Sequence, residues 1–264
     1  MIAWVYSLPP LPLGLFMVAL VEVMSLAGLF LVRRFVQPRL HYSDGVSDAV
    51  SGTVQSIGVF YGITIGLIAV GVWNNAANAS TLASNEAAII AALYRDVTSY
   101  PEPPRAAMQA DLVRYTEGIV KDDWPAHSRG LVPITGALHL NALQSSLTTF
   151  EPVTEGQKIL HAEALRAFNT LVQARRQRID AVGGGLSGPM WGVIWIGAAI
   201  SIAVSFFFKI EDPKIHAILI SLVATFLGIL LFVIVVNDRP FAGPMALGPD
   251  SYQKLLDMVS QAPK

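Results

Sequence analysis

SIGVFYGITIGLIAVGVW, residues 56–73, is an uncharged, largely apolar stretch that is long enough to cross a lipid bilayer as a helix. Within it Gly58, Gly62 and Gly66 recur at every fourth position, so in a helix they form one groove without side chains. Such a groove lets a second backbone approach closely, which favours helix association in lipid. The stretch therefore predicts a membrane helix that packs against protein through its glycine face.

A second face of the same helix is a candidate lining for a narrow pore, because it lies about a quarter turn or more from the glycines. Rings of apolar side chains can close a pore by dewetting, and asparagine amides at its outer mouth would offer neutral hydrogen-bond donors. The alternative interpretation is that these residues simply fill the interior of a membrane protein. The members of this face are Ile57, Tyr61, Thr64, Ile68, Val72 and Asn75.

The composition is that of a membrane protein. Hydrophobic residues make up 53% of the 264 residues and charged residues 14%, against about one quarter charged in ordinary soluble domains. The chain has no cysteine, which excludes disulfides, thiolate nucleophiles and cysteine-ligated metal sites. The apolar composition predicts membrane lipid as a partner. The formal net charge of -1 leaves no basic surplus, so we expect no nucleic-acid partner.

Four apolar runs predict an all-α, polytopic membrane protein in which two transmembrane helical hairpins flank a helical extramembrane domain. The first run follows a segment without the positive charge of a secretory signal, so we expect it to be a retained span. The predicted spans are residues 11–32, 54–73, 189–208 and 215–236. The predicted regions are hairpin 1 at 1–74, the extramembrane domain at 75–185, hairpin 2 at 186–236, and a tail at 237–264 with a short amphipathic helix.

Helix signals also occur inside the extramembrane domain. The second span is expected to continue as one helix to near Tyr100, because no proline interrupts it before Pro101. Thr154 and Gln157 form a capping-box pattern, which predicts the start of a long helix. A glycine run at residues 183–185 is expected to end that helix as a hinge.

Glu22 is a carboxylate near the middle of the first predicted span. An ionised side chain there would cost several kcal/mol unless it is paired or turned into the bundle. Its functional interpretation is an ion or proton site. Its structural interpretation is a protonated or hydrogen-bonded glutamate, for which Ser25 is a nearby candidate partner.

The sequence NDRPFAGP follows the fourth span directly. Proline and glycine at these positions force the chain to turn, and the acidic and basic residues before them can pair at the membrane interface. We interpret the motif as a structural clasp, with a ligand site as the alternative. Its residues are Asp238, Arg239, Pro240 and Phe241.

An enzyme is the least expected class. The five histidines are scattered without a metal-binding spacing, so we expect no metal site, no catalytic residues and no cofactor. The glycine run at residues 183–185 also lacks the lysine and hydroxyl residue of a phosphate-binding loop.

Segments outside the spans match one known family. They are LVRRFVQPR after the first span, NEAAIIAALYRDV and YPEPPR after the second, LVRYTEGIVKDDWP in the next helix, RRQR before the third span and NDRPFAGPMALGPDSYQKLL after the fourth. On these segments the chain resembles the bestrophin-like family of bacterial four-span membrane proteins, a domain of unknown function. It is more distantly similar to the bestrophin anion channels, which are pentamers lined by their second helix.

This resemblance implies a multi-pass protein of the bacterial inner membrane that assembles as a homo-oligomer, pentameric like the bestrophins, and conducts small ions. Residues 56–73 would then line the pore. The alternative hypothesis is a non-conducting oligomeric sensor or scaffold, in which the helical insert binds a partner and the glycine groove only holds subunits together.

Overall fold

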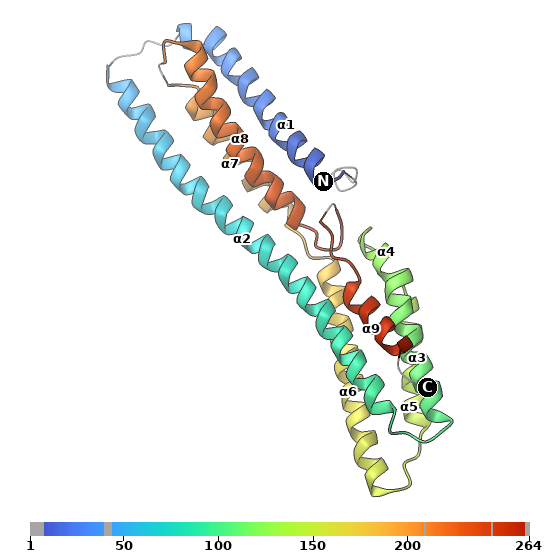
Figure 1. Cartoon of the computed structure of the whole chain (residues 1–264). Helices are drawn as coiled ribbons and strands as arrows, with labels where there is room; N and C mark the ends of the chain where they lie inside the picture. Colours follow the sequence, from blue (N-terminus) through green and yellow to red (C-terminus); the bar gives the residue numbers. More distant parts are fainter. Residues whose placement is uncertain (1–7, 40–43, 209, 244, 262–264) are drawn as a thin grey trace. The chain divides into compact units, whose positions relative to one another are not determined.

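The computed structural model describes residues 8–39, 44–208, 210–243 and 245–261, and every regular element in these ranges is helical (Figure 1). This confirms the predicted all-α fold class. The chain divides into two compact units, and each is described by itself below.

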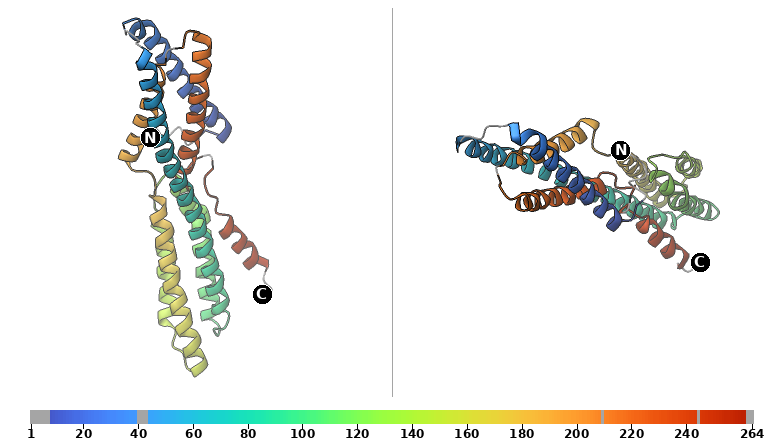
Figure 2. Two further views of the ribbon diagram at one scale, coloured as in Figure 1. Left: turned by 90° about the vertical axis from the view of Figure 1, so that its left-hand side faces the viewer. Right: turned by 90° about the horizontal axis from the view of Figure 1, so that it is seen from above.

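The first unit comprises residues 1–75 and 185–238 and contains the membrane helices. Among the described residues, four helices are long and apolar enough to cross a membrane. Within this unit they run side by side in the views of Figures 1 and 2. They are α1 (Pro10–Leu31), the first part of α2 (Asp44–Val97), α7 (Gly188–Ser205) and α8 (Pro213–Asn237).

Helices α1 and α8 approach each other closely. A Cβ built on Gly228 of α8 would lie only 2.8 Å from the Cα of Val18 on α1, so this contact requires glycine. Small residues allow such close packing of helices in lipid. Beyond its end, α1 continues into two short turns, η2 (Val32–Val36) and η3 (Gln37–Arg39). The buried core between the two helices includes Leu13, Met17, Val21, Ala224, Leu227 and Leu231.

Helix α2 is one continuous helix of 54 residues that contributes to both units. It begins at Asp44, well before the predicted start of the span at residue 54, because no proline stops it there. It ends at Val97, close to the predicted end near Tyr100. The second span thus continues into the insert without a break.

The second unit comprises residues 76–184 and 239–264 and packs shorter helices around the second part of α2. The predicted capping box is present at the start of α6: Thr154 Oγ1 accepts from the Gln157 amide across 3.2 Å, and Gln157 Oε1 accepts from the Thr154 amide across 3.3 Å. The helices are α3 (Pro104–Gly118), η4 (Ile119–Asp123), α4 (Trp124–His127), α5 (Thr135–Thr149), α6 (Glu155–Val182) and α9 (Asp250–Gln261).

From Arg239 onward, the tail belongs to this second unit. In α9, Tyr252 and Leu255 are buried in the same core as residues of α2, α3, α5 and α6. The turn η4 joins α3 to α4 with a wider π-type helical turn, so the backbone stays helical from Pro104 to His127. Other members of this core are Leu93, Met108, Leu112, Leu143, Leu147 and Leu171.

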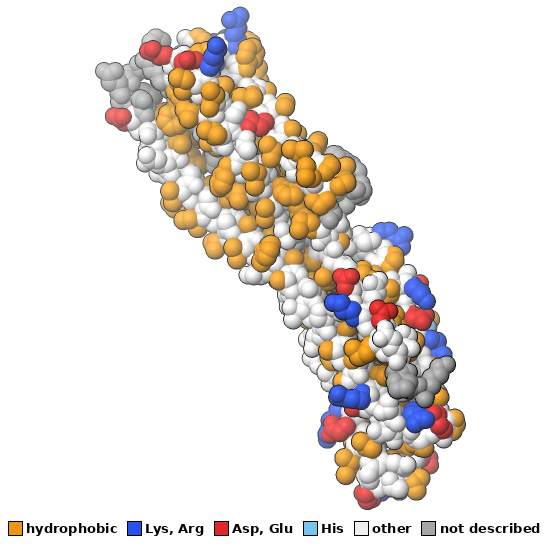
Figure 3. Space-filling model, viewed as in Figure 1, with side chains coloured by type: hydrophobic (Ala, Val, Ile, Leu, Met, Phe, Trp, Pro, Cys, Tyr) orange, Lys and Arg blue, Asp and Glu red, His pale blue; other side chains and the backbone are white. Residues whose placement is uncertain are grey.

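The surface of the two units differs in character. Figure 3 shows apolar side chains gathered over the membrane helices, whereas charged side chains are frequent on the second unit. Large exposed apolar residues on the membrane helices include Phe30, Phe60, Leu67, Leu222 and Phe226. An apolar surface of this kind suits lipid or a neighbouring protein, not water.

Candidate functional site

The membrane part of α2 packs on its own unit through a single stripe of side chains. Tyr61, Ile65, Ile68 and Val72 are all buried, and their spacing of three or four residues keeps them on one face of the helix. They share a core with residues of α7 and α8. The Tyr61 hydroxyl donates to the carbonyl of Ile194 on α7 across 2.9 Å.

This burial corrects the predicted pore lining. The sequence assigns Tyr61, Ile68 and Val72 to a pore face, but their exposed fractions are only 8%, 7% and 5%. A side chain enclosed by its own subunit cannot line a pore that several subunits share. The remaining members of the predicted face are half-buried at the edge of the same stripe: Ile57, Thr64 and Asn75.

The glycine groove of α2 faces away from its own chain. Gly58 and Gly62 are exposed and Gly66 is half-buried. A Cβ built on any of the three would meet nothing within 4 Å among the described residues. Its predicted role as a helix-packing site therefore needs a partner from outside the chain.

The face of α2 opposite the buried stripe is apolar and exposed. Val59, Ile63 and Val70 are 59%, 59% and 57% exposed. They lie four and seven positions apart, on one line about 180° around the helix from the buried stripe. Gly66 and Asn74 fall on this line as well. We refer to these five residues as the outer stripe of α2.

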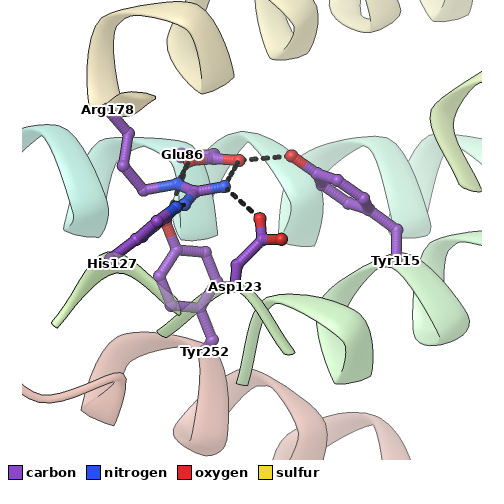
Figure 4. A network of polar contacts seen from close by, with 6 residues as sticks. All are labelled: Glu86, Tyr115, Asp123, His127, Arg178 and Tyr252. Atoms are coloured by element: carbon purple, nitrogen blue, oxygen red, sulfur yellow. Dashed lines mark hydrogen bonds and ion pairs between the residues drawn. The ribbon is translucent and has the colours of Figure 1, made fainter. Parts of the chain in front are cut away.

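The second unit encloses a network of polar side chains, each at most 1% exposed (Figure 4). Burying charges in a protein is costly unless they are paired and hydrogen-bonded. The network therefore requires the helical elements that carry it to hold one arrangement. Its members each come from a different element: Glu86 of α2, Tyr115 of α3, Asp123 of η4, His127 of α4, Arg178 of α6 and Tyr252 of α9.

Arg178 lies at the centre of this network. Its Nε donates to Glu86 Oε2 across 2.5 Å, and its Nη2 donates to Asp123 Oδ2 across 3.2 Å. Its Nη1 lies 3.3 Å from Nδ1 of His127, which must accept because a guanidinium only donates. Burial by itself would lower the pKa of Arg178, but the charge of Glu86 outweighs it and holds that pKa raised. Arg178 is therefore charged.

Glu86 also accepts two tyrosine hydroxyls. Tyr115 donates to its Oε1 across 2.5 Å and Tyr252 to its Oε2 across 2.9 Å. Burial, with the charge of Glu86 added, raises the pKa of both tyrosines well above the ordinary value of 10. Both hydroxyls therefore keep their protons and stabilise the carboxylate.

His127 and Asp123 are shifted toward their neutral forms. Burial lowers the pKa of His127 to about 3, with the charges of Arg178 and Arg175 acting in the same direction. Burial also raises the pKa of Asp123, against the opposing effect of Arg178. His127 is thus a neutral acceptor at physiological pH.

Sequence reasoning did not find this network. Glu86 and Arg178 are 92 residues apart, and no local spacing joins them. One signal was available, because Glu86 lies on the same helical face as Ala79, Ala83 and Ile90, all of which are buried. A carboxylate on an apolar helix face predicts a buried cation, because burying an unpaired charge is costly.

Glu22 is half-buried between α1 and α8. Thr225 Oγ1 donates to its Oε1 across 2.6 Å, whereas Oε2 is buried with no hydrogen-bond partner among the described residues. The predicted partner Ser25 instead donates to the carbonyl of Val21 across 2.6 Å, the usual local bond of a helical serine. The carboxyl is hydrogen-bonded across two helices, and an ion or proton site there stays a prediction.

The motif after α8 begins with a buried aspartate. Asp238 is 4% exposed, and its Oδ1 accepts from the amide of Leu186 across 2.6 Å. A Cβ on Gly185 would lie 3.4 Å from the carbonyl oxygen of Asp238. Asp238 thereby ties the end of α8 to the segment that enters α7.

The rest of the motif lies in the second unit. The carbonyl of Pro240 accepts from the amide of Leu247 across 2.8 Å, which closes the turn. Phe241 is buried, with its ring 5.5 Å from that of Trp124, whereas Arg239 is exposed. The clasp stays our interpretation of these residues.

The described part of the chain contains no group of three or more histidine and carboxylate side chains placed to hold a metal ion. Three of the four described histidines instead have separate partners. Besides His127, His161 bonds to the hydroxyl of Tyr100 across 2.8 Å, and His216 lies 3.2 Å from Arg33. His41 lies outside the described residues.

Four apolar helices and a long helical insert define the chain as a helical membrane protein. A family model for the Bestrophin-like domain matches residues 19–252, and the chain belongs to that family. This confirms the resemblance seen in the sequence. Family and fold together support an ion channel as the general class of function.

Solved structures share this fold. Two of them are crystal structures of a bacterial bestrophin homolog from Klebsiella pneumoniae, each with a point mutation. The first is 10% identical, with a TM-score of 0.68 and coverage of 94% of this chain and 99% of that chain. The second is 13% identical, with a TM-score of 0.65 and coverage of 95% and 99%. No curated protein matches the chain in sequence.

Proposed function

We propose that the chain is one subunit of a homo-oligomeric ion channel in the bacterial inner membrane, with its pore lined by the outer stripe of α2. The subunit number expected from the bestrophin resemblance is five. The four apolar helices support a multi-pass topology.

The main support for this proposal is that the membrane part of α2 packs against its own unit through one face only. Its buried stripe shares a core with α7 and α8, so in a ring of subunits these two helices lie behind α2. The opposite face then points to the ring axis. The outer stripe occupies that face and has no cover from the described chain.

The chemistry of the outer stripe suits a hydrophobic neck. Val59, Ile63 and Val70 would each form a ring of apolar side chains, which can gate a pore by excluding water. Gly66 leaves a wider level between them. Gly58 and Gly62 lie to one side of this line, where a neighbouring α2 can approach closely.

Planar bilayers that contain the purified full-length protein test the proposal. We expect discrete single-channel currents, and we expect these to change when Ile63 of the outer stripe is replaced. A well-folded oligomer that shows no conductance under any condition would instead favour the non-conducting scaffold. In that case the glycine groove serves only to hold subunits together.

A further inference from the structure

A groove lies at the end of the first unit where α1 stops and α8 begins. It has a volume of ≈ 400 Å³, within the range of about 300–1,000 Å³ that is typical of ligand sites. Leu26, Leu29, Phe30 and Ala217 line it with apolar side chains. The remaining lining includes two guanidinium groups, Arg33 and Arg34, on the turn η2.

Arg33 is held in place by the segment between α7 and α8. Its Nη1 donates to the carbonyl of Ile210 across 3.1 Å, and its Nη2 donates to the carbonyl of Glu211 across 3.2 Å. Nη1 also lies 3.2 Å from Nδ1 of His216, whose Nε2 lies 3.2 Å from the carbonyl of Ser205. Because a carbonyl only accepts, Nε2 carries the proton and Nδ1 accepts from Arg33.

These bonds use three of the five N–H donors of Arg33, so two remain for a ligand. Arg34 is exposed and has no hydrogen bond or ion pair among the residues that the structure describes. Among the described residues, no carboxylate lies within ion-pair distance of Arg33 or Arg34. The groove therefore presents two positive charges that the described chain does not neutralise.

We propose that this groove binds one anionic phospholipid, with its phosphate on Arg33 and Arg34 and its acyl chain along the apolar wall. Charge complementarity selects the phosphate, because guanidinium groups bind it through paired N–H donors. The position selects a lipid over a soluble anion: α1 ends at Leu31 and α8 begins at Pro213, so the arginines lie where two membrane helices end. The apolar wall then extends from the arginines toward the membrane interior.

Native mass spectrometry of the purified full-length protein tests this proposal. The protein is incubated with phosphatidylglycerol or with phosphatidylcholine of the same acyl chains. We expect the protein to retain phosphatidylglycerol preferentially, and Arg34→Gln to lower that retention about fivefold, the typical contribution of one basic residue near anionic lipid. Arg39→Gln is the matched control, because Arg39 is exposed on the same segment but does not line the groove.

Three results would overturn the proposal. The first is equal retention of the two lipids, or equal loss in Arg34→Gln and Arg39→Gln. The second is full displacement of phosphatidylglycerol by inorganic phosphate, which would make the groove an anion site without acyl-chain recognition. The third comes from Ala217→Trp, which fills the groove: a change in subunit number with unchanged lipid retention would show that a second copy of the chain occupies it.

Discussion

The guanidinium of Arg178 lies fully buried against the carboxylate of Glu86, with its Nε donating to Oε2 across 2.5 Å. This contact joins α6 to α2 inside the second unit. Because both side chains are 0% exposed, neither charge can be solvated by water if the other is removed. The pair therefore makes the arrangement of these helices depend on both residues.

We expect Arg178→Met to lower the free energy of unfolding by about 3–5 kcal/mol, since it leaves Glu86 buried without a cation. The double variant with Glu86→Gln should recover part of that loss. Thermal unfolding in detergent, followed by helicity, measures both. Arg166→Met is the control on the same helix: its partner Glu163 is exposed, so the expected change is about 0–1 kcal/mol. Equal effects of the two methionine variants would contradict this account.

The stability of the second unit should fall in mild acid because of His127. Its pKa is about 3 in the folded protein and 6.5 in an unfolded chain, so between these values the unfolded state binds the extra proton. Stability is thus complete above about pH 6.5 and declines as the pH falls toward 3, by up to roughly 1.4 kcal/mol per pH unit.

Replacing His127 isolates this effect. The raised pKa of Asp123 acts with the opposite sign, because its stabilisation is present at low pH and lost as the pH rises through the folded value. Asp123 is retained in His127→Gln, so the difference between the two stability profiles reports the histidine. As the pH is lowered from 8 to 4, the unfolding midpoint of the wild-type protein should fall relative to that of His127→Gln, because only the wild type carries the titrating histidine. Parallel profiles would rule out His127 as the source.

Tyr61 requires glycine at position 197 of α7. A Cβ on Gly197 would lie 2.4 Å from two ring carbons of Tyr61, closer than any contact allows. We expect Gly197→Ala to cost about 1–3 kcal/mol, the usual effect of overpacking a core. Gly192→Ala, on the same helix with nothing within 4 Å, should be nearly neutral. Thermal stability in detergent distinguishes the two, and Tyr61→Leu should make Gly197→Ala tolerable.

One role of Asp238 is to offer an acceptor to the amide of Leu186. Asp238→Ala leaves that amide unsatisfied, so we expect a loss of about 1–3 kcal/mol and less assembled protein. Asp238→Asn keeps an oxygen acceptor and should recover most of the yield in size-exclusion chromatography. Normal assembly of Asp238→Ala together with altered conductance would point to a gate in place of a clasp.

Conductance should depend on Ile63 and not directly on Ile68. Ile63→Ala shortens an exposed side chain on the outer stripe and leaves the buried core unchanged. We therefore expect a larger conductance or open probability in planar bilayers. Ile68→Ala instead opens a cavity in the core and should cost about 2–5 kcal/mol of stability. If Ile68→Ala changed conductance and Ile63→Ala did not, the result would favour the pore face predicted from the sequence.

Much of the fold follows from local patterns. The four spans, the uninterrupted α2 and the capping box at Thr154 all rest on residues within a few turns of one another. The start of α2 at Asp44 was not predicted, because a chain without proline can remain helical well beyond its apolar run. The clasp and the glycine groove were recognised as sequence motifs, but a motif does not show which residues pack against it.

The sequence alone determined that this chain is a helical membrane protein and that α2 carries glycines on one face, because composition and periodicity are properties of the chain itself. The resemblance of its segments outside the spans pointed to the bestrophin-like family, which the family model confirms. Only the tertiary structure decided which face of α2 points inward, that Thr225 and not Ser25 bonds Glu22, and that Arg178 neutralises Glu86. The physical reason is that burial and pairing depend on what packs opposite a residue. In each of these cases the partner lies more than a hundred residues away or on another helix.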